Sequence, residues 1–332
     1  MLIREEIERR EDQFLSPFAA RAAKTAGRKR SEDKDPYRTD YQRDRDRIIH
    51  CKSFRRLKHK TQVFISPVED HYRTRLTHTL EVAQIARTLA RALQLNEDLT
   101  EAIALGHDLG HTPFGHGGEH ALDDILFKNF GVHFYHNIQS VRVVEVIEKD
   151  GKGLNLTAEV IDGIRNHPTE EPQPGTLEGK LVRMSDRFAY LRHDIEDAIN
   201  AKVLERKEIP DQYMKVLGDN ILNTFVSDLI DQSRGKPDVM MSNRVREAMN
   251  GLYDFMYEHV YTNPFAKREE GKVPDMLTLL FRHYHYDDPE FRKGVAETDQ
   301  LQHTVDFIAG MTDRFAINKF EELFVPREWR TA

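Results

Sequence analysis

The part of the sequence richest in side chains that could do chemistry is residues 105–120, which read LGHDLGHTPFGHGGEH. This segment holds four histidines, one aspartate and one glutamate. Its five glycines let the backbone turn tightly and approach a ligand closely. Burying so many imidazoles and carboxylates without partners would be costly, so we expect them to be paired, exposed or bound to a metal ion. A histidine-rich surface loop is the simpler alternative.

Possible partners for this segment lie in two other parts of the chain. His78 lies at the start of one expected helix, and Asp186 lies within another. With the adjacent His107 and Asp108 they make a set of two histidines and two aspartates. Such nitrogen and oxygen ligands, without thiolates, suit Mg²⁺, Mn²⁺, Fe²⁺ or Co²⁺ with open positions better than a closed structural zinc site. The adjacent pair can serve one metal only at the end of a helix, where the backbone opens towards Gly110.

The elements that must position these residues are predicted to be helices. Apolar residues recur every three or four positions in residues 79–93, 177–200, 245–255 and 303–320. The same spacing follows Asn96, which is a possible cap of a further helix. Strand-like alternation is scarce. The sequence therefore predicts an all-α fold of packed helices around one site.

The chain shows no internal repeat, no low-complexity tract and no convincing domain boundary. We expect residues 1–40 to form a basic N-terminal arm and first helix, residues 41–200 the catalytic core, and residues 201–332 a helical region packed on that core. No apolar run approaches the roughly 20 residues that span a bilayer, so we expect no membrane partner. The charged N-terminus lacks the apolar region of a signal peptide. Cys51 is the only cysteine, which indicates a reducing compartment, and we expect the cytoplasm.

Positive charge is concentrated in residues 21–60, where 15 lysines and arginines face six acidic residues on a chain of net charge −7. A basic segment on an acidic protein indicates local anion binding rather than a surface that binds nucleic acid throughout. We therefore expect lysines and arginines of this segment to help hold phosphates. The alternative for residues 21–34 is a solvated, partly disordered arm.

His78, the pair His107–Asp108 and Asp186 form an H…HD…D pattern, and five longer motifs surround it. They read YQRDRDRIIHCKSFRRLKHKTQVF (41–64), RTRLTHTLE (73–81), GHDLGHTPFGHGGE (106–119), DRFAYLRHDIEDA (186–198) and IAGMTDRFA (308–316). In this order they resemble the deoxyguanosinetriphosphate triphosphohydrolases of the HD superfamily, in particular the shorter bacterial type. The resemblance covers almost the whole chain. It implies an HD-domain helical bundle with additional C-terminal helices.

The resemblance also implies the metal and catalytic residues. One divalent cation per subunit, Mn²⁺ or Mg²⁺ with Fe²⁺ or Co²⁺ as alternatives, would be held by the H…HD…D residues. His116 and Glu119 match the family's catalytic pair of an imidazole and a carboxylate. Such a carboxylate fixes the tautomer of the imidazole and raises its pKa, which favours a proton donor to the poor 5′-alkoxide leaving group. A packed loop histidine is the simpler alternative for His116.

Six further positions match the family's substrate contacts. They are Arg75, His111, Arg187 and Tyr190 for the phosphates, and Gln62 and Asp194 for the sugar 3′-hydroxyl. Four of these positions also have a structural alternative: the two arginines could form surface ion pairs, the tyrosine could be core, and the aspartate could be a charge on a helix face.

The expected reaction is metal-dependent hydrolysis of deoxynucleoside triphosphates, dGTP first, to a deoxynucleoside and inorganic triphosphate. One alternative is an HD phosphodiesterase or 5′-nucleotidase that uses the same ligands on other nucleotides. The other is a nucleic-acid-binding regulator with a vestigial metal site. Because relatives assemble, the resemblance also implies a homo-oligomer, and single-stranded DNA is a possible regulatory partner.

Other histidines permit a second metal site. His136 or His167 could be additional ligands, but structural or surface roles are favoured for them and for His133 because the resemblance implies one metal. The run HYHYDD at residues 283–288 is expected to be a turn after a helix.

Overall fold

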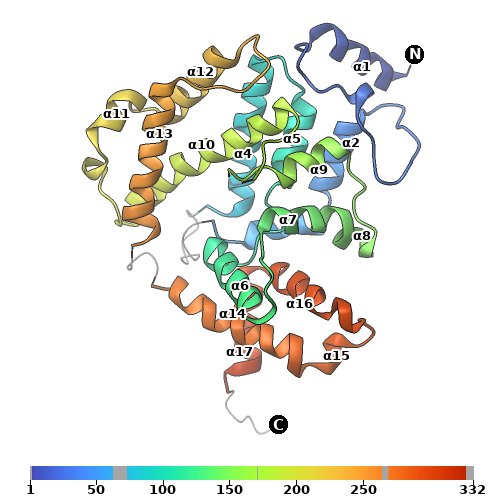
Figure 1. The fold of residues 1–332 in the computed structure, drawn as a ribbon, viewed down its shortest axis with the longest axis vertical. Helices are drawn as coiled ribbons and strands as arrows, with labels where there is room; N and C mark the ends of the chain where they lie inside the picture. Colours follow the sequence, from blue (N-terminus) through green and yellow to red (C-terminus); the bar gives the residue numbers. More distant parts are fainter. Residues whose placement is uncertain (1, 63–72, 170, 264–267, 327–332) are drawn as a thin grey trace, which may run out of the picture.

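The fold is all-α in this computed structural model, which describes residues 2–62, 73–169, 171–263 and 268–326 (Figure 1). No strand forms among these residues, which contain only isolated bridges between Arg28 and Thr157 and between Thr61 and Thr74. The fold prediction is thus confirmed. Val63 and Phe64, the end of one sequence motif, lie outside the described residues. The α-helices are α1 (Ile3–Phe14), α2 (Asp40–Ile49), α3 (Lys52–Arg56), α4 (Arg75–Ala92), α5 (Glu97–Gly106), α6 (Gly115–Phe130), α7 (His136–Arg142), α8 (Glu148–Gly151), α9 (Ala158–Arg165), α10 (Leu177–Asn200), α11 (Asp211–Leu217), α12 (Ile221–Ser233), α13 (Asn243–Met256), α14 (Val273–Arg282), α15 (Pro289–Arg292), α16 (Gln300–Ala309) and α17 (Asp313–Phe324).

Helices α5 and α10 have the boundaries that the sequence predicts. The side chain of Asn96 accepts a hydrogen bond from the amide of Leu99 at 3.1 Å and caps α5. Thr176 accepts one from the amide of Gly179 at 3.1 Å and caps α10. These caps satisfy amides that have no partner in the first helical turn. The two helices therefore begin at defined residues.

The single helix predicted over residues 303–320 is wrong. The chain forms two helices there, α16 and α17, with Gly310, Met311 and Thr312 between them. Glycine is a poor helix former, and Thr312 accepts a hydrogen bond from the amide of Phe315 at 3.3 Å, which starts the next helix. A local break and a new cap thus override the continuous apolar periodicity.

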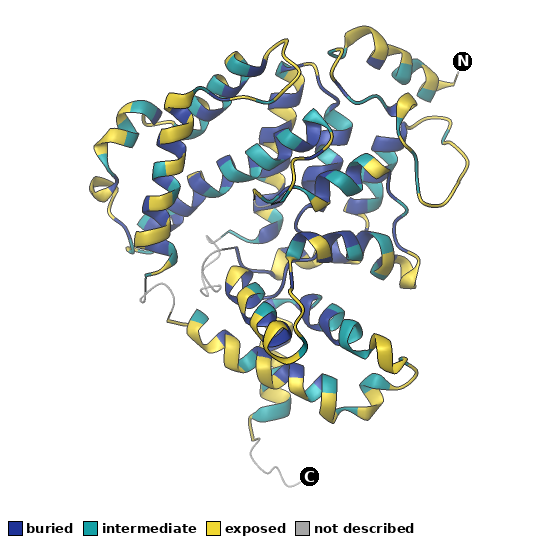
Figure 2. Ribbon diagram, in the orientation of Figure 1, coloured by how far each residue is buried: buried dark blue, intermediate teal, exposed yellow. Residues whose placement is uncertain are grey.

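The helices pack around two hydrophobic clusters. Figure 2 shows that the buried faces of the helices point inwards. The first cluster unites α2, α4, α5, α9 and α10 with α12 and α13. The second unites α6 with α14, α16 and α17, in the lower half of Figure 1. The helices after residue 200 therefore contribute to both clusters. Within the described part of the chain, no helix is long and apolar enough to cross a bilayer.

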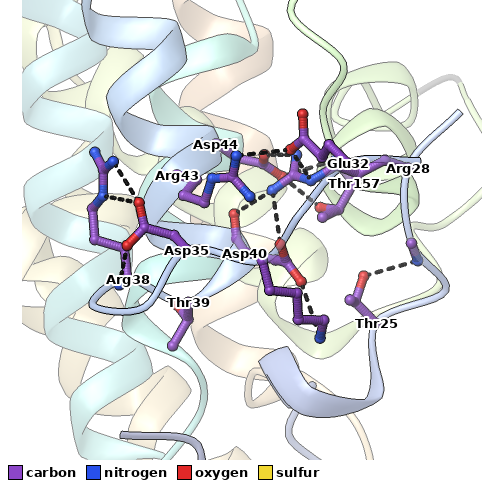
Figure 3. Close-up of polar contacts among 12 residues, drawn as sticks. Thr25, Arg28, Glu32, Asp35, Arg38, Thr39, Asp40, Arg43, Asp44 and Thr157 are labelled. Atoms are coloured by element: carbon purple, nitrogen blue, oxygen red, sulfur yellow. Dashed lines mark hydrogen bonds and ion pairs between the residues drawn. The ribbon is translucent and has the colours of Figure 1, made fainter. Parts of the chain in front are cut away.

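The basic N-terminal segment is anchored by buried ion pairs (Figure 3). The side chain of Arg28 is 5% exposed and contacts Glu32 at 3.0 Å, Asp40 at 3.2 Å and the fully buried Asp44. Asp44 also accepts a hydrogen bond from the hydroxyl of Thr157 at 2.7 Å. The alternative of a partly disordered arm is therefore wrong for the stretch around Arg28.

Candidate active site

The four predicted metal ligands converge although three separate segments carry them. Helix α4 supplies His78, the turn directly after α5 supplies His107 and Asp108, and α10 supplies Asp186. Asp186 Oδ1 lies 3.0 Å from His78 Nε2 and 3.9 Å from His107 Nε2. His107 Nε2 lies 3.6 Å from Asp108 Oδ2. The group thus has the spacing of ligands that can share one cation.

Helix α7 holds the turn that carries His107 and Asp108. The hydroxyl of Ser140 donates to the carbonyl of His107 at 2.7 Å and accepts from the amide of Gly110 at 2.8 Å. A β-carbon at Gly110 would overlap the backbone of Gln139 and Ser140, so only glycine allows this approach. The adjacent histidine and aspartate therefore project from a fixed backbone.

His107 supplies a direct test of whether the group fits a metal. Its Nδ1 donates to the carbonyl of Ala104 at 2.7 Å, which leaves Nε2 with its lone pair free. Nε2 is buried and has no hydrogen-bond partner among the described residues. An unpaired buried nitrogen is costly unless a ligand occupies the space beside it. The ligand group therefore fits a divalent cation.

The carboxylates of the group are held in their charged form. Burial alone would raise the pKa of Asp108, but His107 and Arg75 outweigh it and hold that pKa well below its usual value. Burial likewise opposes the charge on Asp186, but its hydrogen bond with His78 and the nearby His107 lower the pKa of Asp186. Both oxygen ligands are therefore anionic, as a cation site requires.

A pocket of about 350 Å³ opens beside the ligand group. It lies between the two hydrophobic clusters, because α4 and α10 of the first cluster and α6 of the second all line it. All six predicted substrate contacts line this pocket: Gln62, Arg75, His111, Arg187, Tyr190 and Asp194.

Arg75 lies inside the pocket wall with most of its donors free. The residue is 2% exposed, and its NH1 donates to Asp108 Oδ2 at 2.6 Å. Its Nε and NH2 have no hydrogen-bond partner in the described part of the chain. Arg187 donates to Asn250 Oδ1 at 2.9 Å and stacks on the ring of Tyr253. Neither arginine forms a surface ion pair, its structural alternative, with another residue that the structure describes.

Gln62 and Asp194 are buried on the pocket wall. Gln62 Oε1 has no hydrogen-bond partner among the residues described. Asp194 accepts a hydrogen bond from His193 at 2.8 Å, and its other carboxylate oxygen accepts one from the hydroxyl of Tyr261. At 3% exposure, Asp194 is not a solvated charge on a helix face. Tyr190 is half-buried between pocket and core.

Glu119 contacts three imidazoles rather than one. Its Oε2 lies 3.5 Å from His116 Nδ1 and 3.5 Å from His111 Nε2. Its Oε1 accepts a hydrogen bond from His136 Nδ1 at 2.7 Å. Burial opposes the charge on His136, but Glu119 outweighs it and raises the pKa of His136. The sequence motifs predict the contact of Glu119 with His116 but not its closer contact with His136.

The other histidines weighed as ligands differ in their surroundings. His167 Nε2 lies 3.2 Å from His136 Nε2, and both side chains lie close enough to Asp108 for a shared cation. His133 is exposed and pairs with Asp123 at 2.9 Å. The HYHYDD run prolongs α14 by a π-helical turn (His283–Asp287) and contributes nothing to the pocket.

The pocket also contains residues that sequence reasoning missed. Tyr253, Tyr257 and Tyr261 form an aromatic wall, and Arg183 adds a further positive charge. The three tyrosines recur every four residues along α13 and the π-helical turn that follows it (Tyr257–Tyr261), so they share one helix face. That spacing was the signal that could have found them.

The basic segment of residues 21–60 does not reach the pocket. None of its lysines or arginines is among the described residues that line the cavity. Arg45 pairs with Asp98 at 2.9 Å, and the buried Lys60 donates to the carbonyls of His111 and Ala309. The described residues therefore do not meet the expectation that this segment supplies phosphate ligands, because part of its charge is matched within the fold and none of its basic residues lines the pocket.

The chain is similar to known proteins over almost its whole length. The HD domain family matches residues 75–191, and the phosphohydrolase-associated domain matches residues 239–322. A deoxyguanosinetriphosphate triphosphohydrolase-like protein of Caldanaerobacter subterraneus subsp. tengcongensis is 54% identical, over 99% of this chain and 98% of the relative. Proteins with the same description from Desulfatibacillum aliphaticivorans and Clostridium tetani are 47% and 43% identical, each over 98% of this chain and over 99% and 97% of their own lengths. The chain belongs to this family of HD-domain, metal-dependent phosphohydrolases.

Proposed function

We propose that this protein hydrolyses deoxynucleoside triphosphates to a deoxynucleoside and inorganic triphosphate, with dGTP as the leading substrate. The observation that carries the proposal is the pocket in which a cluster of two histidines and two aspartates adjoins the half-paired, buried guanidinium of Arg75. Two separate centres that bind anions suit a polyphosphate better than a monophosphate. The descriptions of the relatives favour dGTP among the deoxynucleotides.

The cation ligands in this proposal are His78, His107, Asp108 and Asp186. Mn²⁺ or Mg²⁺ is the expected ion, with Fe²⁺ or Co²⁺ as alternatives. When bound, such an ion supplies a positive charge that offsets charge on the α-phosphate and lowers the pKa of a water molecule.

Four further residues bind the phosphates in this proposal. The free Nε and NH2 of Arg75 point to a role as donors to phosphate oxygens. Burial and the nearby Arg75 hold the pKa of His111 well below its usual value, so this imidazole is neutral and can donate one hydrogen bond. Arg187 and Tyr190, from the same face of α10, complete the phosphate contacts.

The deoxyribose lies against Gln62 and Asp194 in the proposed complex. Gln62 Oε1 is an unpaired acceptor, and the carboxylate of Asp194 has lone pairs in addition to the two that are already used. Either oxygen can accept the single hydrogen bond that the 3′-hydroxyl donates. Tyr253 and Tyr257 offer aromatic faces to the sugar and base.

The proposed reaction forms one bond and breaks one. A water oxygen attacks the α-phosphorus, and the bond between that phosphorus and O5′ breaks. His116 donates its proton to O5′, so the deoxynucleoside leaves as a neutral alcohol. The attacking water keeps one proton on the new triphosphate oxygen and releases the other to solvent, and solvent returns a proton to His116. Glu119 lies behind His116 and orients the imidazole through the 3.5 Å contact with Nδ1. The exposed position of His116 lets it reach a substrate in the pocket.

A substrate panel tests the proposal directly. The purified protein is incubated with each dNTP, alone and in mixtures, with Mn²⁺ or Mg²⁺, and the products are identified by chromatography. We expect triphosphate and the matching deoxynucleoside, fastest with dGTP. Release of orthophosphate or pyrophosphate would contradict the reaction. Cleavage of monophosphates or cyclic dinucleotides alone would favour the 5′-nucleotidase or phosphodiesterase alternative.

The role of His116 has its own test. Changing His116→Ala should lower kcat by about 100- to 10,000-fold, the usual contribution of a general acid, while Mn²⁺ binding stays intact. His133→Ala is the matched control, since His133 is also an exposed histidine paired with a carboxylate. Unchanged turnover in His116→Ala would reject the assignment.

Partners of the enzyme follow from the same proposal. We expect a homo-oligomer, which light scattering on the purified protein measures. The regulator alternative predicts salt-dependent binding of single-stranded DNA without turnover. The internal ion pairs of Arg28 and Arg45 weaken that alternative, because these charges are already matched.

A further inference from the structure

A continuous line of hydrogen bonds joins the pocket wall to one of the proposed metal ligands. Asp194 Oδ1 lies 2.8 Å from His193 Nδ1, and His193 Nε2 lies 3.0 Å from His78 Nδ1. His193 is fully buried and does not line the pocket. His193 therefore contacts Asp194, which lines the pocket, and His78, which belongs to the ligand group. Its own side chain is exposed neither to solvent nor to the pocket.

Helix geometry explains why His193 can make this link. His193 follows Asp186 by two helical turns on α10, so both side chains lie on the face of α10 that packs against α4. Asp186 Oδ1 lies 3.0 Å from His78 Nε2, while His193 lies at the opposite nitrogen of the same ring. One helix thus contacts both nitrogens of His78.

The order of donors and acceptors along the line is fixed by its first member. An ionised carboxylate only accepts, so His193 Nδ1 carries the hydrogen in the bond to Asp194. The Nε2 of a neutral His193 is then an acceptor, and His78 Nδ1 must donate to it. In the metal-loaded protein, His78 Nε2 would then offer its lone pair to the cation in place of its present contact with Asp186 Oδ1.

We propose that His193 is a positioning residue that fixes the ring orientation and tautomer of His78 and joins this ligand to the Asp194 side of the pocket. The inference rests on the metal-ligand role given to His78 in the proposed function. It adds a residue that makes no contact with the cation or the substrate in that function.

The role of Tyr261 strengthens the link with the pocket. Its hydroxyl donates to the second oxygen of Asp194, and Tyr261 itself lines the cavity. The carboxylate of Asp194 is therefore held from two sides, by Tyr261 and His193. The orientation of His78 depends on a carboxylate that the pocket wall keeps in place.

Metal titration of two substitutions tests the proposal. His193→Phe retains a flat ring but removes both nitrogens, whereas His193→Gln supplies one donor and one acceptor. We expect His193→Phe to weaken Mn²⁺ binding, measured by calorimetry or electron paramagnetic resonance, by about 10- to 100-fold. His193→Gln should recover most of the affinity. Saturating Mn²⁺ should restore kcat in His193→Phe more fully than it does in His116→Ala.

The visible spectrum of bound Co²⁺ adds a readout of ligand geometry. We expect His193→Phe to alter this spectrum and His193→Gln to leave it close to that of the unaltered protein. His285→Phe, a half-buried histidine of the second cluster region, is the matched control and should change neither affinity nor spectrum. A folded His193→Phe with unchanged Mn²⁺ affinity and an unchanged Co²⁺ spectrum overturns the proposal.

A measurement on the unaltered protein covers the case in which His193→Phe does not fold. Imidazole ¹⁵N shifts of the Mg²⁺-loaded protein report which ring nitrogen carries hydrogen. We expect hydrogen on Nδ1 of both His78 and His193, and hydrogen on Nε2 of His193 overturns the proposal. If the unaltered protein binds no divalent cation, the proposed function and this inference both fail. If it binds one and only the His193 results are negative, the inference alone fails.

Discussion

Two buried arginines, Arg28 and Arg75, show how the same side chain serves different purposes in this molecule. Each guanidinium nitrogen of Arg28 lies within 3.2 Å of an oxygen atom, from Glu32, Asp40 or the carbonyl of Asn155. Arg75 has one such contact, to Asp108, and its other two nitrogens have no hydrogen-bond partner among the described residues. Every nitrogen of Arg28 thus has an oxygen within contact distance, although its Nε, like two nitrogens of Arg75, has no hydrogen-bond partner among the described residues. The two arginines differ in their ion pairs, since Arg75 pairs with Asp108 alone among these residues.

The number of partners of a buried charge indicates whether it has a structural or a ligand-binding role. A buried charge with a full set of partners stabilises the fold, whereas unpaired buried donors are costly and persist where a ligand uses them. Arg75 lines the pocket beside the proposed cation ligands. Sequence composition does not separate the two cases, since the basic segment that contains Arg28 looked equally suited to anions.

The largest expected effect is the loss of stability in Arg28→Met. This change leaves the buried Asp44 without its cation, so the free energy of unfolding should fall by about 3–5 kcal/mol. Urea denaturation measures the change, and activity per folded molecule should be unaltered. Lys52→Met is the control, because the pair of Lys52 with Asp150 is exposed at 3.5 Å. An Arg28→Met protein of normal stability would contradict the claim that the ion pairs of Arg28 stabilise the fold.

Arg75→Met should show the opposite pattern. Turnover should fall by about 100- to 1,000-fold, as when a preorganised donor to a developing charge is removed. The urea midpoint should change little, because the lost pair with Asp108 is offset by removing two unpaired buried donors. Steady-state kinetics with the best dNTP and urea denaturation together provide the check. Full activity would show that the free donors of Arg75 have no ligand.

Glu178 is a third kind of buried charge and gives a smaller, pH-dependent effect. Its Oε1 accepts hydrogen bonds from the amides of Asn96 and Ala20, but its Oε2 has no hydrogen-bond partner in the described structure. Burial raises the pKa of Glu178 to about 7, and burial also raises the pKa of the nearby Glu11 to about 7. Neither residue lines the active-site pocket.

The sign of the pH effect follows from these raised pKa values. The folded protein binds these protons more tightly than the unfolded chain, where the pKa is about 4.5. Their contribution to stability is complete below pH 4.5 and is lost as the pH rises through about 7. Glu178→Gln should flatten this dependence and raise the urea midpoint at alkaline pH. A pH profile identical to that of the unaltered protein would contradict the assignment.

The sequence predicts those parts of the fold that depend on neighbouring residues. The bounds of α10 and the Asn96 cap of α5 follow from periodicity and cap chemistry within a few positions. The break at Gly310 was missed because the apolar spacing of α16 and α17 continues across it.

Site residues could be predicted where they occupy positions of the family's sequence motifs. His78 and Asp186 were identified in this way, and the structure brings them together. The hydrogen bond from His136 to Glu119 was not predictable, since it depends on how α6 and α7 pack. His193 was also missed, because only the packing of α10 on α4 shows which partners its ring nitrogens have.

Helix α6 has a consequence for how catalysis depends on remote parts of the protein. It begins with His116 and Glu119 and then buries its apolar face against α14, α16 and α17. The proposed cation ligands lie instead on α4, on α10 and in the turn after α5, and these elements belong to the other cluster. The distance between the proposed proton donor and the proposed cation ligands therefore depends on how the first and second hydrophobic clusters pack against each other. Repacking the interior of the second cluster would therefore alter the proposed reaction, even at positions that do not line the pocket.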